Sequence, residues 1–514
     1  MNGAESLVRT LVAGGVNVCF TNPGTSEMHF VSALDRVDGM RCVLGLFEGV
    51  VTGAADGYAR MLDRPASTLL HLGPGLANGL ANLHNAKKAS SCIVNIVGEH
   101  ATYHIKHDAP LTADIEGIAR PMSHWVKTSP DSRSVAADGA AAIAAARTPP
   151  GQIATLILPA DTAWNPAEGT AKLPPVPERA AVGKEAMAAA VRVLRSGEPT
   201  LLLLTGRALR ARGLDFASRI ATKTGCKLWA QGSNARTERG AGRVALLRIP
   251  YVVEQALAVL KEFRHIILVE AKEPVAFFAY PDKPSQLKPE GCELHRLCTP
   301  QEDSIQALEW LAEELGAKPG DARPQARVET PLPSGALGHE SIARALGALL
   351  PENAIVVDES VTTGRGFFPF TAGAPPHDWM TNMGGSIGYG TPVGTGAAIA
   401  CPDRKVICLE GDGSAMYTLQ SLWTQARESL DVTTVIFANR SYQILKGELA
   451  NVGAGNPGRK ALDMLDIDRP TLDWVSLAKG MGVPGSRVGN VDELCKAFAA
   501  AMKSAGPKLI EVTL

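Results

Sequence analysis

The sequence has no excess of charge of either sign and no long apolar run. Its 51 Lys and Arg residues face 52 Asp and Glu residues, so no whole-protein field attracts nucleic acid or an anionic membrane. No stretch approaches the roughly 18 to 20 apolar residues of a membrane span, and the start, MNGAESLVRT, lacks the pattern of a secretory signal. These absences predict a cytoplasmic protein whose partners are small molecules.

Two known motifs, one based on cysteine and one based on glycine, are also lacking. The nine cysteines are scattered without a CxxC pair, which favours reduced thiols over disulfides or zinc ligands. No GxGxxG opens a strand-helix unit that is followed, about 20 residues on, by an acidic residue. An ordinary dinucleotide-binding dehydrogenase is therefore a weak interpretation.

What the chain does have is length and a regular alternation of segments. Its 514 residues predict about three domains. Two stretches rich in Pro and charge, 164–181 and 317–334, look like linkers. Elsewhere short apolar runs such as CIVNIVG, TLLLLTG and KVICLEGDG alternate with Ala-rich helical stretches. This pattern predicts the α/β class, with three doubly wound parallel-sheet domains at 1–163, 182–320 and 335–514.

Oxygen-bearing residues follow two apolar runs of the last third. Gly411, Asp412 and Gly413 come directly after KVICLE, and Asn439 ends the run TTVIFAN, 27 residues after Asp412. The glycines let a backbone approach a phosphate, while Asp412, Asn439 and a backbone carbonyl at Ser441 offer the hard oxygens that Mg²⁺ prefers. A helix beginning near residue 415 would point its amino terminus at the same phosphate. Taken alone, GDGS could equally be an ordinary turn.

The spacing of GDG and Asn resembles the signature of thiamine-diphosphate enzymes, specifically the branch containing benzoylformate decarboxylase and acetolactate synthase. The resemblance implies thiamine diphosphate and Mg²⁺ as cofactors. It also implies a pyrimidine-binding domain at 1–163, a middle domain at 182–320 and a diphosphate-binding domain at 335–514. The sequence departs from the usual Asn-Asn pair, because Arg440 follows Asn439. Metal binding is expected to survive this change.

Glu48 lies within GLFEGVVTGAADGYAR, a run of small and apolar residues where a carboxylate is unfavourable unless something pairs with it. A lone glutamate would more often face solvent on a helix. In the family, a glutamate here hydrogen-bonds the cofactor pyrimidine and promotes removal of the thiazolium proton. Glu48 lies in a different domain from Asp412, so the resemblance implies that a homodimer or homotetramer completes the site.

Further cofactor contacts are implied by the same resemblance. Ser360 and Thr362, after the run AIVVDE, and Ser414 and Tyr442, beside the metal motif, are expected near the diphosphate. Gly385 and Ile387 lie in TNMGGSIGYGTP, which resembles the segment that seats the aminopyrimidine, with Ile387 holding the cofactor bent. The simpler alternatives are helix caps for Ser360 or Thr362 and plain core packing for Ile387.

The substrate pocket is expected to contain Gly24, Thr25, His71, Ile444 and Leu445. Gly24 and Thr25 lie at the turn after VCFTNP, where related enzymes meet substrate. His71 matches the active-site histidine of benzoylformate decarboxylase and can relay protons. Phenylalanines replace that enzyme's second histidine, at residues 277 and 278.

Three questions about the sequence have more than one possible answer: the role of three clustered histidines, the setting of Lys446 and Glu448, and the presence of FAD. His100, His104 and His107 are interpreted as substrate contacts or pocket rim, or equally as solvated loop histidines, and only weakly as metal ligands. Lys446 and Glu448 are interpreted as an exposed helix face rather than pocket residues. FAD is doubtful, because the middle domain lacks the GMHG-type segment of flavin-containing synthases.

The function predicted from these residues is a thiamine-diphosphate- and Mg²⁺-dependent 2-oxo acid decarboxylase or carboligase, similar to benzoylformate decarboxylase. The resemblance implies attack of an ylid on the ketone, loss of CO₂ to an enamine, and then protonation or addition to a second carbonyl. An enzyme similar to the acetolactate synthase catalytic subunit is the alternative. A cofactor-binding homologue without catalytic activity is the alternative of another class. The particular 2-oxo acid stays open.

Overall fold

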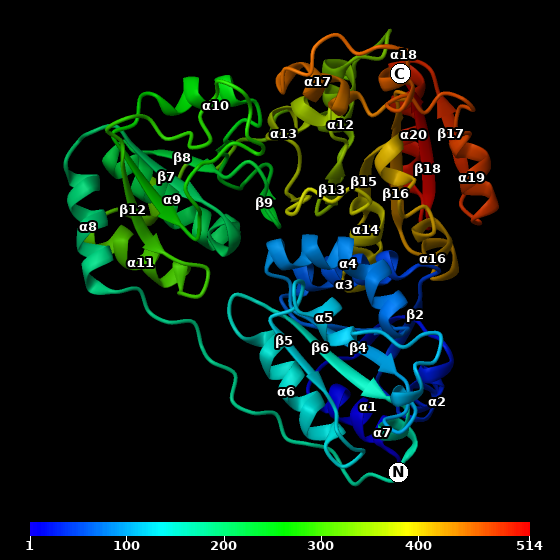
Figure 1. Ribbon diagram of the computed structural model, residues 1–514. Coiled ribbons are helices and arrows are strands. Elements are labelled where there is room, and N and C mark those ends of the chain that lie inside the picture. The colour runs from blue at the N-terminus through cyan, green and yellow to red at the C-terminus, as the bar shows by residue number, and fades with distance from the viewer.

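Three separate sheets, each built mainly of parallel strands, organise the molecule (Figure 1). The computed structural model describes all residues from 1 to 514. The first sheet lies at the bottom of Figure 1, the middle sheet at the left and the third at the right, with a long extended segment leading into α8 of the middle unit. The predicted α/β class is confirmed.

The first sheet is entirely parallel, with the strand order β2-β1-β3-β4-β6-β5. Its strands are β1 Val18–Asn22, β2 Arg41–Leu44, β3 Ala66–Leu70, β4 Ile93–Glu99, β5 Trp125–Thr128 and β6 Ile153–Pro159. One face is covered by α3 Glu48–Leu62, α4 Leu72–Ala89 and α5 Ile115–Ala119. The other face is covered by α1 Gly3–Ala13, α2 Met28–Arg36, α6 Val135–Arg147 and α7 Ala160–Trp164. Apolar side chains of the strands therefore pack against helices on both faces of this sheet, as the continuous apolar runs in the sequence predict.

The middle sheet has five parallel strands in the order β10-β8-β7-β11-β12. They are β7 Thr200–Leu204, β8 Lys227–Ala230, β10 Leu247–Arg248, β11 His265–Val269 and β12 Glu293–Cys298. Its helices are α8 Lys184–Arg195, α9 Ala211–Thr224, α10 Val253–Leu260 and α11 Ser304–Glu314. Two buried clusters, one on each face of the sheet, hold these helices in place.

The third sheet has seven strands in the order β17-β18-β16-β15-β13-β14-β9. The parallel strands are β13 Ile355–Glu359, β14 His377–Thr381, β15 Val406–Gly411, β16 Val432–Ala438, β17 Gly485–Val488 and β18 Lys508–Thr513. Its helices are α12 His339–Leu349, α13 Phe367–Phe370, α14 Gly390–Ala400, α15 Asp412–Ala415, α16 Ser421–Arg427, α17 Gln443–Asn451, α18 Arg459–Asp463, α19 Trp474–Gly480 and α20 Val491–Lys503. No helix of the structure combines the length and apolar character that a membrane crossing demands.

One strand crosses from the predicted middle segment into the third sheet. β9 Thr237–Arg239 pairs antiparallel with β14, with Arg239 opposite His377. The three domain boundaries drawn from composition remain a prediction. The pairing of β9 shows that a strand from the predicted middle domain, 182–320, also contributes to the third sheet.

The first and third units share a buried core through α3 and α14. Val51 and Ala54 of α3 belong to the same hydrophobic cluster as Val393 and Ala397 of α14. Glycine permits this close approach, since a Cβ on Gly57 would collide with the backbone of Val393. The two units thus share a packed interface within one chain.

Candidate functional site

Glu48 lies at the carboxyl end of the first sheet, where β2 leads into α3. It is the first residue of α3 and is only 8% exposed. Asn78 of α4 donates a hydrogen bond from Nδ2 to Glu48 Oε2 at 3.0 Å, and no basic side chain is paired with the carboxylate. Glu48 is therefore not the solvent-facing helix residue of the simpler interpretation.

His71 lies beside Glu48 and is held by Glu27, a residue that was not predicted to belong to the site. His71 Nδ1 is 2.8 Å from Oε2 of Glu27, and that oxygen also accepts the Gly24 amide at 2.7 Å. Burial raises the pKa of Glu27, an effect that His71 partly offsets. Glu27 is 2% exposed, and its Oε1 has no hydrogen-bond partner. The sequence contains one local signal for the role of Glu27, because this carboxylate comes three residues after Gly24 of the predicted turn.

The turn at Gly24 is shaped around the imidazole ring. A Cβ on Gly24 would collide with the ring of His71, so only glycine permits this approach. Thr25 is exposed at the start of the following 3-10 turn, Thr25–Glu27. Leu72, directly after His71, has a φ of +49°, a costly conformation for a leucine. Strained backbone therefore adjoins this candidate acid-base pair.

Asp412 anchors a second group of polar residues, at the carboxyl end of the third sheet. It follows β15 and is 3% exposed. Its Oδ1 accepts the Gly413 amide at 2.9 Å, and its Oδ2 accepts the Arg440 amide at 2.6 Å. Burial raises the pKa of Asp412 to about 6, because these amides only partly offset the loss of water. A cation beside it would stabilise the ionised carboxylate.

Asn439 and Ser441 lie on the neighbouring turn after β16. Asn439 Oδ1 accepts the Ser441 amide at 3.0 Å, and the Ser441 hydroxyl donates to the Leu465 carbonyl at 3.1 Å. Arg440 has a φ of +58°, a left-handed conformation that asparagine tolerates better than arginine. Its backbone N–H, not its side chain, contacts Asp412, which explains why the departure from the Asn-Asn pattern leaves this turn intact.

The glycines and Tyr442 form the wall around Asp412. A Cβ on Gly413 would collide with the ring of Tyr442, whereas a Cβ on Gly411 would meet nothing closer than 3.6 Å. Ser414 is buried. The helix expected near residue 415 begins earlier, at Asp412, and α15 ends at Ala415. That expectation was wrong, because Asp412 already adopts helical backbone geometry and the chain turns again before α16.

Ser360 and Thr362 lie on the adjacent turn after β13. The hydroxyl of Ser360 donates to Asp358, and its amide donates to the same oxygen at 3.1 Å. Neither Ser360 nor Thr362 caps the following 3-10 turn with its side chain, so the helix-cap alternative is wrong. Val361 between them has a φ of +50°, which is strained for a β-branched residue.

The segment with Gly385 and Ile387 is held by α4 of the same chain. Asn85 Nδ2 donates to the Ser386 carbonyl at 2.8 Å, and Asn82 Nδ2 donates to the Gly388 carbonyl at 3.2 Å. Ile387 is only partly buried and belongs to none of the hydrophobic cores. Plain core packing therefore does not explain it.

Helix α17 presents Ile444 and Leu445 on a surface of the single chain. The helix has no buried residue, and Leu445 is 44% exposed. Lys446 forms an ion pair with Asp466 at 2.5 Å, and Glu448 accepts a hydrogen bond from Tyr251 at 3.3 Å. Lys446 and Glu448 are both half-buried and contact other residues, so they do not form a free, solvent-exposed helix face.

The histidines after β4 lie next to one another, with tilted rings, in a loop. The ring centroids of His100 and His104 are 5.5 Å apart, and those of His104 and His107 are 5.6 Å apart. His104 and His107 are exposed. Phe277 and Phe278 were expected to occupy the place of the second histidine of benzoylformate decarboxylase. Each is 53% exposed, and the two rings pack edge to face.

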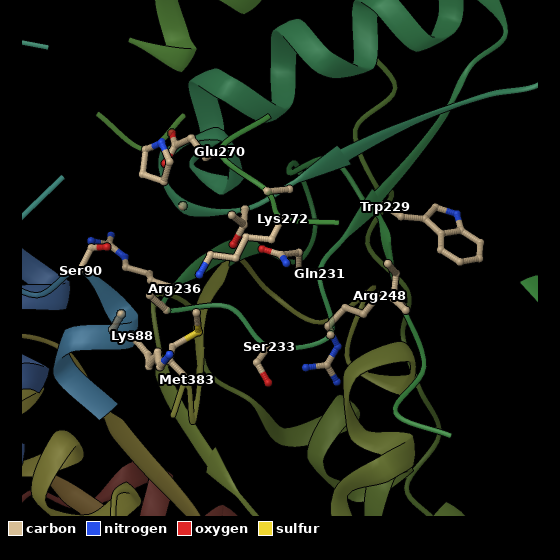
Figure 2. A pocket seen from close by; sticks show the side chains of 18 of the residues that line it. Lys88, Ser90, Trp229, Gln231, Ser233, Arg236, Arg248, Glu270, Lys272 and Met383 are labelled. Carbon is tan, nitrogen blue, oxygen red and sulfur yellow. The ribbon is translucent and has the colours of Figure 1, made fainter. Parts of the chain in front are cut away.

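A cavity of about 1920 Å³ lies at the carboxyl ends of the middle strands (Figure 2). Residues from all three units line it, including Lys88, Lys272 and Met383. Twelve Lys and Arg residues line it against three Asp and Glu residues, so it favours an anionic over a cationic ligand. None of the site residues expected from the sequence lines this cavity.

Comparison with known proteins places this geometry in a family. Residues 1–118 match the model "Thiamine pyrophosphate enzyme, N-terminal TPP binding domain", and residues 365–512 match the corresponding C-terminal TPP binding domain. Across 100% of the chain and 99% of the relative, the sequence is 54% identical to a Mycobacterium tuberculosis protein named "Putative acetolactate synthase large subunit IlvX". The chain belongs to the thiamine pyrophosphate enzyme family.

Two further relatives of this thiamine pyrophosphate enzyme bear decarboxylase names. Benzoylformate decarboxylase of Pseudomonas aeruginosa is 29% identical, with 97% of this chain and 96% of the relative covered. A 4-hydroxybenzoylformate decarboxylase of Rhodococcus jostii RHA1 superposes with a TM-score of 0.86 at 27% identity, covering 100% of this chain and 99% of that one. The matched regions contain both groups of polar residues described above.

The residues of this thiamine pyrophosphate enzyme fit its expected cofactor. Asp412 is a buried carboxylate whose oxygens accept backbone amides and form no ion pair. Asn439 places a second hard oxygen on the next strand end. Such a donor set suits a hard divalent cation that carries a diphosphate.

Proposed function

We propose that the enzyme is a Mg²⁺- and thiamine-diphosphate-dependent 2-oxo acid decarboxylase or carboligase. The observation that carries the proposal is the buried Glu48 at the amino terminus of α3, next to the Glu27–His71 pair. A carboxylate and an acid-base pair at adjoining strand ends can handle protons on both a cofactor and its substrate.

The diphosphate-binding half of the proposed site consists of the strand ends β13, β15 and β16. Asp412, the side-chain oxygen of Asn439 and the backbone carbonyl of Ser441 would hold Mg²⁺. Thiamine diphosphate, when bound, supplies a nucleophilic carbon and an electron sink for carbon–carbon cleavage. Gly411 and Gly413 would let backbone amides approach the diphosphate, lined further by Ser360, Thr362, Ser414 and Tyr442.

The proton-handling half consists of residues from the first unit. Glu48 would hydrogen-bond a pyrimidine nitrogen, with Asn78 keeping the carboxylate in place. His71, fixed through Nδ1 by Glu27, would exchange a proton with the substrate through Nε2. Gly24 and Thr25 would contact the substrate at its carboxylate end, with Ile387, Ile444 and Leu445 as apolar walls.

Two products distinguish the two candidate reactions. The decarboxylase interpretation is favoured by the His71–Glu27 pair, which can deliver the proton that makes an aldehyde. The carboligase interpretation is favoured by the 54% identity to a protein named as an acetolactate synthase large subunit. Neither reaction changes the net oxidation state of its reactants, so the proposal requires no flavin.

The test is release of CO₂ and identification of product from a panel of 2-oxo acids, with thiamine diphosphate and Mg²⁺ present. Glu48→Gln should lower the rate by about 100-fold or more, because the residue can no longer exchange a proton. Glu352→Gln, an exposed loop variant, serves as the matched control. An aldehyde product identifies a decarboxylase, and acetolactate from pyruvate identifies a synthase.

Equal rates from the native chain and Glu48→Gln would show that Glu48 does not activate the cofactor. Absence of CO₂ from every 2-oxo acid would favour a cofactor-binding homologue without this activity. Measuring bound thiamine diphosphate in the purified protein by mass spectrometry separates that outcome from a failure to bind the cofactor.

A further inference from the structure

A cluster of metal-ligating side chains lies at the amino-terminal end of the middle sheet. His265 is the first residue of β11, and Glu293 is the first residue of β12. The strand register pairs His265 with Glu293, and His295 lies two residues further on the same face. The large cavity lies at the opposite, carboxyl end of these strands, so the cluster is separate from it.

Three side-chain atoms of this cluster converge on one point. His265 Nδ1 is 3.1 Å from His295 Nε2, and Glu293 Oε2 is 3.7 Å from His265 Nδ1 and 3.6 Å from His295 Nε2. The centre of that triangle lies about 2.0 Å from each atom. Zinc binds imidazole nitrogen at about 2.0–2.1 Å and carboxylate oxygen at about 2.0–2.2 Å. The triangle therefore has the dimensions of three ligands around one ion.

A second carboxylate orients the first histidine. His265 Nε2 lies 2.7 Å from Glu198 Oε2, in the turn after α8. A proton held on Nε2 for this bond leaves the lone pair of Nδ1 directed at the cluster. Metal-ligating histidines almost always donate their other ring N–H to a carboxylate, a backbone carbonyl or water.

The hydrogen bonds of the protein leave the Glu293 carboxylate outside the histidine pair. With Nε2 of His265 protonated, the N–H on His295 Nε2 donates to His265 Nδ1, while Glu293 Oε2 lies 3.6 Å from His295 Nε2, beyond hydrogen-bond distance. A cation at the centre would satisfy both nitrogens and the carboxylate together. The side chain of Glu293 is 68% exposed, so solvent can reach the cluster and supply a fourth ligand.

We propose that His265, His295 and Glu293 form a binding site for a divalent transition-metal ion such as Zn²⁺, with Glu198 as a positioning residue. Two imidazoles and one carboxylate suit zinc and its neighbours better than Mg²⁺, which prefers oxygen ligands alone. The ion would join β12, an edge strand, to β11. The site is independent of the proposed catalytic function.

Equilibrium dialysis of the full-length, chelator-stripped protein against Zn²⁺, with excess Mg²⁺ to occupy oxygen-only sites, tests the proposal. The native chain should bind Zn²⁺ at this site, and His295→Gln should weaken binding by more than about 100-fold. Glu198→Gln should weaken it by about 10- to 100-fold, as expected for an orienting carboxylate. His29→Gln, an exposed histidine stacked on Trp164, is the matched control.

Thermal unfolding provides the second measurement. Zn²⁺ should raise the unfolding temperature of the native chain and of His29→Gln, but not that of His295→Gln. Equal Zn²⁺ affinity in the native chain and His295→Gln would overturn the proposal, as would no binding by the native chain. Unchanged circular dichroism of metal-free His295→Gln excludes misfolding as the cause of a loss. An unchanged affinity in Glu198→Gln would overturn the positioning role alone.

Discussion

At the scale of single residues, the site depends on side chains that are held by neighbours outside the recognisable motifs. Glu48 is held by Asn78, and His71 is held by Glu27. Glu27 combines burial, a raised pKa and an oxygen without a partner, which are features of functional carboxylates. The supporting residues come from different elements than the residues they hold, so local patterns do not show which side chains meet.

Gly24→Ala tests the contact between the glycine turn and the imidazole. The added methyl group would collide with the His71 ring and move it away from Glu27. We expect activity to fall by roughly 100-fold, the scale of an error of about 1 Å in catalytic geometry. Steady-state kinetics on the substrate found in the panel measures the effect.

Gly183→Ala is the control, because a Cβ there meets no atom within 4 Å. Full activity in Gly24→Ala, with unchanged NMR chemical shifts of the His71 ring, would contradict this account of the turn.

At the scale of elements, the pairing of β9 with β14 buries a histidine beside an arginine. Arg239 of β9 lies opposite His377 of β14, with Nη1 3.4 Å from His377 Nε2. Burial, reinforced by Arg239, lowers the pKa of His377 to about 3. His377 is thus neutral in the folded protein near neutral pH and accepts from the guanidinium.

This pairing makes the third unit sensitive to acid. Between pH 6.5 and about 3 the unfolded chain binds a proton at His377 that the folded chain does not, so stability is present above pH 6.5 and is lost as pH falls. Lowering the pH from 6.5 to 5 should remove about 2 kcal/mol through this group. Urea unfolding at both pH values measures the loss.

His377→Gln should reduce that pH dependence, since glutamine can accept from Arg239 but does not titrate. His107→Gln, in an exposed loop, is the control for removing a histidine. The same pH dependence in the native chain and His377→Gln would show that another group is responsible.

At the scale of the whole molecule, the two groups of polar residues remain separate within one chain. No hydrogen bond or ion pair connects the Glu48 group with the Asp412 group, and the cavity of about 1920 Å³ contains neither. Leu445 is exposed beside the second group. A homodimer in which one chain supplies Glu48 and its partner supplies Asp412 would complete the site, and this assembly is part of our proposal.

Mixing two inactive variants tests the shared site. Glu48→Gln and Asp412→Asn subunits, unfolded together and reassembled, should recover about a quarter of native activity. Half of the random dimers are mixed, and each mixed dimer contains one intact site and one doubly altered site. No recovery, with mixed dimers verified by differently tagged subunits, would place Glu48 and Asp412 of one chain in the same site.

Much of the fold could be predicted from local pattern. The runs CIVNIVG, TLLLLTG and KVICLEGDG form β4, β7 and β15, since apolar runs bounded by glycine and polar residues reflect strands buried on both faces. The GDG and Asn spacing likewise predicted two neighbouring strand ends, because β15 and β16 are consecutive and paired. The family assignment rested on such local features and is confirmed.

Other features depended on contacts between residues distant in the chain. The antiparallel addition of β9, the hold of Glu27 on His71 and the convergence of His265 with His295 each depend on strand order and register. The sequence by itself determined the α/β class, most strand positions and the polar residues that end the strands, because periodicity and turn chemistry act over a few residues. Only the tertiary structure decided which of those residues meet, because strand order and close packing are settled by burial among segments tens to hundreds of residues apart.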